Sequence, residues 1–125
     1  MITGLSPGTA ETLGWPWTAT FDARGANADR LTVTPDLLRL EIMPASVFTR
    51  SEHSFPLRDV TGVAARTETR NRARPVPGAQ DTGLRVPAGE VLVVDLPAGQ
   101  LVFPVKDAAM VRRVVGARVR RQDHG

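Results

Sequence analysis

The sequence predicts a mainly β fold of about seven antiparallel strands, closed by one C-terminal α-helix. Ten Pro and 11 Gly divide the 125 residues into short elements, which favours strands over long helices. Between residues 17 and 105, apolar and polar side chains alternate with the period of two that half-buried strands have. From residue 107 onward the apolar spacing becomes that of a helix, so the helix is expected at the C-terminal end.

Size and composition indicate one domain with a single apolar core. A chain of 125 residues lies in the usual size range of one domain, and 42% hydrophobic residues suit a globular protein. The chain has no Cys, which excludes disulfides, thiolate zinc sites and a thiol nucleophile. No stretch reaches the roughly 18 consecutive apolar residues of a membrane span, and residues 1–14 lack a basic start, so we expect a cytoplasmic protein.

The first strand is predicted from Trp17 to Ala23, where apolar residues alternate with Thr and Asp. The residues before it show no sustained period, so we expect an N-terminal arm over 1–16 and a folded domain over 17–121. The polar stretch 25–29 is predicted as a loop.

A hairpin follows, with strands at Leu31–Val33 and Leu38–Ile42 joined by a Pro35-Asp36 turn. Residues 43–52 are predicted as a longer connection. The next short strand is centred on Pro56 and flanked by apolar residues. Because Pro cannot donate to a ladder, this strand should lie at a sheet edge or be interrupted.

Another strand is predicted to run from Asp59 towards Thr69, with a bulge at Gly62 where the alternation changes phase. Residues 70–88 are rich in Arg, Pro and Gly, and they are predicted as a long loop in which residues 84–86 dock briefly as a strand. The inward side chains of the preceding strand are predicted to be Val60, Val63 and Ala65.

The clearest hairpin joins Val91–Leu96 to a returning strand that ends at Val105, through a turn at 97–100. Asp107 is then a candidate N-cap, because its carboxylate can accept from the free amides of the first helical turn. The helix should fray over 122–125. Its buried face is predicted to comprise Val111, Val114, Val115 and Val119.

Four segments carry a resemblance to a known class of domain. They are RLTVTPDLLRL at 30–40, FPLRDVTGV at 55–63, GLRVP at 83–87 and KDAAMV at 106–111. In order and patterning they resemble the small pleckstrin-homology-like (PH-like) domains of actinobacterial proteins of unknown function. The resemblance implies a PH-like barrel over residues 17–121, in which two nearly orthogonal sheets are plugged at one end by the C-terminal helix.

The sequence carries no recognisable catalytic or cofactor motif. Neither His53 nor His124 has a neighbouring Cys or His, so we expect no metal site. A Ser-His-Asp set can be assembled on paper from Ser51 or Ser54, His53 and Asp59, but no nucleophile elbow accompanies it. Glycines are not spaced as in phosphate-binding loops. We expect no enzyme and no cofactor; an enzyme would need a pocket that holds His53 beside an acid and a hydroxyl.

Basic residues are concentrated in the second half of the chain. Residues 1–60 hold five Arg against seven acids, whereas residues 61–125 hold ten Arg and one Lys against six acids. Fifteen Arg against one Lys is also typical of a GC-rich genome, which raises the Arg content without selection for any partner. Five of these Arg, including Arg118 and Arg121, are predicted on the surface of the C-terminal helix. The candidate binding residues are Arg66, Arg70, Arg72 and Arg74, together with Arg112, Arg113 and Arg120 of the helix.

These features predict a non-catalytic binding module, with protein-protein interaction or scaffolding as the first interpretation. Exposed sheet edges and residues 70–88 are the expected contact surfaces. The alternative is binding to an anionic surface, a phospholipid membrane or nucleic acid, through the Arg clusters, which a steep loss of affinity with salt would reveal. Aromatic residues are not interleaved with these Arg, which weakens the case for single-stranded nucleic acid.

Overall fold

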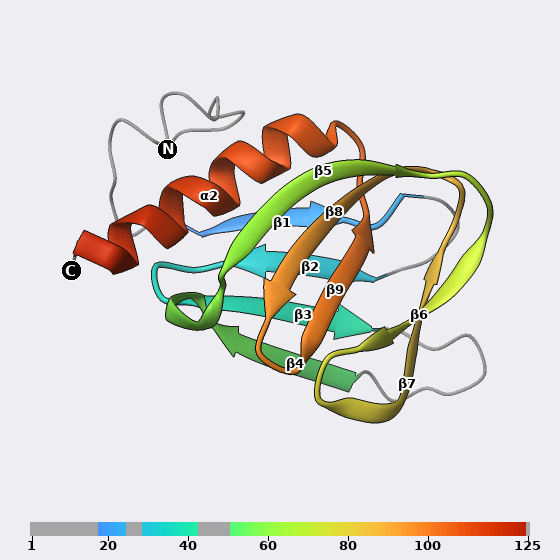
Figure 1. The fold of residues 1–125 in the computed structure, drawn as a ribbon, viewed down its shortest axis with the longest axis horizontal. Helices are drawn as coiled ribbons and strands as arrows, with labels where there is room; N and C mark the ends of the chain where they lie inside the picture. Colours follow the sequence, from blue (N-terminus) through green and yellow to red (C-terminus); the bar gives the residue numbers. More distant parts are fainter. Residues whose placement is uncertain (1–17, 25–28, 43–50, 125) are drawn as a thin grey trace.

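The described residues form nine strands followed by one long helix, α2 (Ala108–His124), as Figure 1 shows. The mainly β fold with a C-terminal helix is therefore confirmed. The predicted arm at 1–16 and most of the predicted connection at 43–52 lie outside the described part of the chain. That part, in a computed structural model, comprises residues 18–24, 29–42 and 51–124.

One antiparallel sheet contains, in spatial order, β1 (Ala19–Asp22), β2 (Arg30–Val33), β3 (Leu37–Ile42) and β4 (Ser51–Pro56). Its inner face is apolar because alternate residues of a strand face the same way: Leu31 lies opposite Leu40, and both are fully buried. β4 lies at the edge of this sheet, as predicted, but it begins earlier than expected, at Ser51, and ends at Pro56. Leu57 belongs to the 3₁₀ turn η1 (Leu57–Asp59) and not to the strand.

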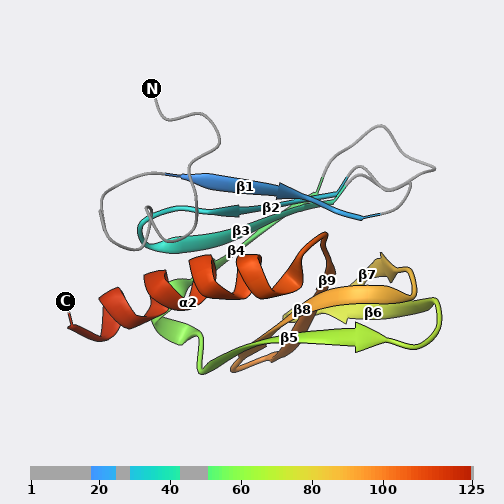
Figure 2. The same cartoon turned by 90° about the horizontal axis from the view of Figure 1, so that it is seen from above.

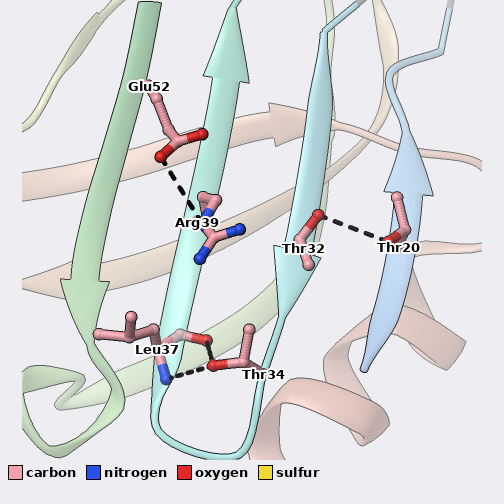
Figure 3. Close-up of polar contacts among 6 residues, drawn as sticks. All are labelled: Thr20, Thr32, Thr34, Leu37, Arg39 and Glu52. Carbon is pink, nitrogen blue, oxygen red and sulfur yellow. Dashed lines mark hydrogen bonds and ion pairs between the residues drawn. The ribbon is translucent and has the colours of Figure 1, made fainter. Parts of the chain in front are cut away.

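The outer face of this sheet is polar. The hydroxyls of Thr20 and Thr32 lie 3.4 Å apart across β1 and β2, and Arg39 Nε lies 3.8 Å from Glu52 Oε1 across β3 and β4 (Figure 3). These polar side chains alternate with the buried leucines, so the two faces of the sheet differ in polarity.

The predicted turn between β2 and β3 is also present. The Thr34 amide donates to the Leu37 carbonyl at 2.9 Å. The Leu37 amide donates to Thr34 Oγ1 at 2.9 Å, as Figure 3 shows. The threonine hydroxyl therefore helps to close the turn, as short hydroxyl side chains commonly do.

A second sheet contains, in spatial order, β5 (Gly62–Glu68), β8 (Gly89–Leu96) and β9 (Gly99–Pro104). The predicted bulge at Gly62 is wrong, because β5 and β8 pair continuously from Gly62 opposite Asp95 onward. The change of phase has another cause: the buried Val60 precedes the strand and follows η1. Ala65, predicted to face inward, is exposed, and Ala64 packs against the core instead.

Residues 70–88 are not a long loop, contrary to the prediction. They form a hairpin of β6 (Arg72–Val76) and β7 (Ala79–Val86), which contacts β9. The prolines are compatible with it because Pro75 lies where the register shifts and Pro77 lies in the turn, positions that tolerate the loss of a ladder donor. Composition alone concealed this hairpin.

The strands lie in two layers, with β1 to β4 in one and β5 to β9 in the other (Figure 2). Within the described residues the sheets remain open and do not join into one closed barrel. The core lies between the layers, and its largest fully buried side chain is Phe103 of β9. No helix in the described part of the chain combines the length and apolar character needed to cross a membrane.

Helix α2 packs against β5, β8 and η1 through its valine face, and Val115 is fully buried. The predicted N-cap is confirmed, since Asp107 Oδ1 accepts from the Met110 amide at 3.3 Å. A second cap comes from β8: the Glu90 carboxylate accepts from the amides of Asp107 and Ala108 at 3.3 and 3.2 Å. The backbone is helical to His124, past the predicted end of the helix.

Candidate binding surfaces

The structure separates the predicted arginines into two groups. The helix arginines are Arg112, Arg113 and Arg120 of α2; the corner arginines are Arg66, Arg70, Arg72 and Arg74 on β5, β6 and the turn between them. In both views the corner between β5 and β6 lies at the end of the molecule away from the second half of α2 (Figures 1 and 2). The two groups come from different elements, and among these seven arginines only the helix arginines line the hollow described next.

All three helix arginines line one hollow of about 320 Å³, here called the α2–β5 groove. One wall is the middle part of α2, residues 112–120, and the other is the start of β5 with the residue before it. The described residues that line it are basic, apolar or a threonine, and none of them is a carboxylate. The lining residues are Thr61, Gly62, Val63, Arg112, Arg113, Gly116, Val119 and Arg120.

Helical periodicity explains how the groove is built. Arg112, Gly116 and Arg120 recur every four residues, so they follow one another along the same stripe of α2. Gly116 has no side chain, and it leaves a gap in this stripe between two guanidinium side chains. A Cβ built on Gly116 would lie 3.5 Å from Arg120 Nη1, which is an ordinary contact.

Two of the three groove arginines, Arg112 and Arg120, have no described carboxylate partner. Arg112 and Arg120 are exposed, and neither is bonded to a carboxylate in the described part of the chain. Asp95 lies against Gly62, but it is not a lining residue, and its Oδ1 accepts from Gln100 Nε2 at 2.8 Å. The groove should therefore attract anions.

A free strand edge runs away from the groove. β5 pairs with β8 on one side only, and no described strand occupies its other side. An edge strand directs alternate backbone N–H and C=O groups outward, where another chain can pair with them. Ala65, Arg66 and Thr67 of β5 are exposed.

The corner arginines differ among themselves. Arg74 donates to Glu68 Oε2 through Nε at 2.9 Å and through Nη2 at 2.6 Å, and this joins β6 to the end of β5. The two side chains are 32% and 13% exposed, so the pair is largely shielded from water. Arg74 is thus part of the fold, whereas Arg66, Arg70 and Arg72 are exposed.

Arg118, assigned to the helix surface from the sequence, is only 4% exposed. It follows Val111 by two helical turns and Val115 by one, so it belongs to the buried face of α2. That assignment was wrong because the basic run at the end of the helix concealed the spacing. The side chain of Arg121 lies outside what the structure describes.

Arg24, which the sequence analysis did not single out, holds the two layers together. Its Nη1 donates to the Ala88 carbonyl at 2.8 Å, and its Nη2 donates to the carbonyls of Pro87 and Glu90 at 3.0 and 2.7 Å. Gly89 leaves the space that this requires: its φ is 126°, and an added Cβ would lie 2.9 Å from Arg24 Cζ. We call this arrangement the Arg24 clamp.

A second hollow, of about 480 Å³, lies between β4 and the turns of the two neighbouring hairpins. His53, Ser54 and Asp59 all line it, so three residues of the Ser-His-Asp set considered from the sequence border one hollow. In the described residues, however, no hydrogen bond joins His53 to Asp59; His53 Nε2 lies 3.4 Å from Ser51 Oγ. Ser54 faces the other side of β4, since successive strand residues alternate.

The α2–β5 groove with the adjoining strand edge is therefore the candidate site. Comparison of the chain with family models, with curated proteins and with solved structures finds no match. Among the described residues, no group of three or more His, Asp or Glu side chains is arranged to hold a metal ion. The groove offers guanidinium donors, apolar contact and unpaired backbone groups, a combination suited to binding another chain.

Proposed function

We propose that this chain is a non-catalytic protein-binding module that holds an extended segment of a partner along the free edge of β5, beside α2. Strand addition of this kind gains affinity from main-chain hydrogen bonds and specificity from side-chain pockets beside the strand. β5 supplies the first requirement and the α2–β5 groove supplies the second. The observation that carries the proposal is that a free edge and a groove meet at the same strand.

The length and proline content of the edge strands favour β5 over β1 and β4 as the strand that pairs with a partner. β1 has four residues and β4 carries a proline, and both features discourage pairing with another chain. β5 has seven residues without a proline. β7 has eight residues without a proline and an open side as well, but no residue of it lines the α2–β5 groove. Among these edges, β5 is therefore the long, proline-free one that borders the groove.

The arrangement also supports kinship with PH-like domains, which is part of this proposal. A four-stranded and a three-stranded antiparallel sheet, with a C-terminal helix at one end, match the expected number and order of elements. On this interpretation the β6–β7 hairpin is an addition between the first and second strands of the second sheet. The chain would be an open relative of the PH-like barrel.

Two proline variants test strand addition. Consecutive amides of β5 point alternately towards β8 and outward, so one of Ala64→Pro and Ala65→Pro removes a ladder donor and the other removes an outward donor. The outward variant is identified as the one whose melting temperature stays close to that of the parent. It blocks the free edge without a change of charge.

Peptides selected on the parent chain from a random display library are then measured on this edge-blocked variant. We expect their affinity to fall by at least about tenfold, because one hydrogen bond is lost and the edge is obstructed. Selected peptides that bind the parent and the edge-blocked variant equally would show that β5 is not the binding edge.

A further inference from the structure

We propose that the segment bound along β5 is acidic, and that its carboxylates are held by Arg112 and Arg120 on either side of Gly116. This inference rests on the proposed strand addition and specifies the chemical class of the ligand. It follows from three properties of the groove: its charge, its alignment with β5 and the glycine at its centre.

The charge of the groove selects for anions. Arg112, Arg113 and Arg120 line it, no acidic residue is among its described lining residues, and Val119 provides an apolar contact beside them. A guanidinium group presents planar, paired donors that match a carboxylate, so a Glu or Asp side chain is bound better than a neutral amide. A partner that places acids over this stripe gains affinity, whereas a basic partner is repelled.

The alignment of α2 with β5 favours a peptide as the ligand. Both views show α2 running along the first part of β5 (Figures 1 and 2). Arg112 and Arg120 are two turns apart, about 12 Å along the helix axis. An extended peptide covers that distance in about four residues, and side chains four residues apart lie on the same face of a strand. Two acids at this spacing would reach both guanidinium groups.

Gly116 is unfavourable for the helix and useful for a ligand. Glycine inside a helix destabilises it relative to alanine, because glycine loses more backbone freedom on folding. No described neighbour of Gly116 requires a glycine there, since an added Cβ would make only an ordinary contact with Arg120 Nη1 at 3.5 Å. The missing side chain instead lets a bound carboxylate or peptide backbone approach the helix between Arg112 and Arg120. The same residue therefore weakens α2 and opens the groove.

The test uses the full chain and two labelled peptides of Thr and Val, one with two Glu four residues apart and one with Gln at the same positions. Fluorescence anisotropy gives the Kd at about 150 mM salt, where weak surface attraction is screened. We expect the Glu peptide to bind at least about tenfold more tightly than the Gln peptide, since charge-assisted bonds are about twice as strong as neutral ones.

Three variants assign the effect to the groove. Arg112→Gln combined with Arg120→Gln should weaken the Glu peptide to the Kd of the Gln peptide, whereas the control pair Arg70→Gln and Arg72→Gln should not change it. Gly116→Ala should weaken binding of the Glu peptide while it raises the melting temperature. A Gly116→Ala chain that is more stable and binds as tightly as the parent would overturn the role given to Gly116.

The outcomes separate this inference from the proposed function. If both peptides bind equally and both are lost on the edge-blocked variant, strand addition stands and acidic recognition is wrong. If the Glu peptide needs Arg112 and Arg120 but ignores the edge block, the proposed strand addition is wrong. If phosphatidylserine vesicles or a DNA duplex displace the Glu peptide and need the same two arginines, the groove recognises an anionic surface and the inference is overturned.

Discussion

Arg24 and the pair formed by Arg112 and Arg120 are chemically identical side chains in two contrasting regions. In the Arg24 clamp, the guanidinium group donates to three backbone carbonyls between 2.7 and 3.0 Å, and a neighbouring glycine leaves room for it. In the α2–β5 groove, the two guanidinium side chains line a hollow and bond to no described carboxylate. One region uses arginine to hold the fold; in the other, the guanidinium groups have no described carboxylate partner and we propose that they bind a ligand.

This difference shows why the arginine content of the chain is a poor guide to its binding residues. Counting gave seven candidates, and the structure divides them by what each guanidinium group already contacts. Arg74 resembles Arg24, since Glu68 occupies its donors. Arg112 and Arg120 differ from both because their donors remain available in a concave surface. The two kinds of arginine carry the same charge and differ in whether their guanidinium donors are already bonded within the fold.

The largest effect is expected at the buried valine face of α2, which holds the helix against the strands. Val115→Asp places a charge at a fully buried position, so the free energy of unfolding should fall by more than about 4 kcal/mol. Circular dichroism and thermal melting measure this loss. Ala109→Asp is the control, because Ala109 is exposed in the first helical turn and should change stability by less than about 0.5 kcal/mol. A Val115→Asp chain that melted like the parent would contradict the orientation of α2.

The Arg24 clamp gives the next largest effect. Arg24→Ala removes several charge-assisted hydrogen bonds and should lower the free energy of unfolding by about 2 to 4 kcal/mol in urea titrations. Gly89→Ala should cost about 1 to 3 kcal/mol, since its backbone conformation disfavours a side chain. Arg30→Ala is the matched control: its ion pair with Asp22 is exposed, so less than about 1 kcal/mol is expected. Equal losses for Arg24→Ala and Arg30→Ala would remove the distinction.

A smaller effect is expected at the β5–β6 corner. Arg74→Ala should lower the free energy of unfolding by about 1 to 2 kcal/mol, a figure reduced by the partial exposure of the guanidinium group. Arg72→Ala, at an exposed position on the same strand, should stay within about 0.5 kcal/mol. If the two substitutions cost the same in urea titrations, Arg74 is not a structural residue.

Periodicity predicted those parts of the fold that depend on neighbours in sequence. The β2–β3 and β8–β9 hairpins and the valine face of α2 were found because each repeats its own period over several residues. The β6–β7 hairpin was missed because its prolines resemble those of a loop. Only the strand pairing shows that they occupy a turn and a register shift.

Contacts between distant segments could not be predicted. Glu90 caps α2 from β8, and Arg24 reaches carbonyls more than sixty positions away in the chain, so no local pattern marks either residue. The candidate site was found in part. The spacing of Arg112 and Arg120 was visible in the sequence, but the groove depends on how α2 lies along β5, and that is set by packing between the layers.

The most direct test of the contrast compares two variants in two assays. Arg24→Gln and the double variant Arg112→Gln with Arg120→Gln are both titrated with urea and with the Glu peptide. We predict that Arg24→Gln loses about 2 kcal/mol of stability and, while folded, retains peptide binding, whereas the double variant stays within about 0.5 kcal/mol of the parent and loses binding. A double variant as unstable as Arg24→Gln, or one that still binds the Glu peptide with the parent Kd, would contradict the division of the arginines into structural and ligand-binding groups.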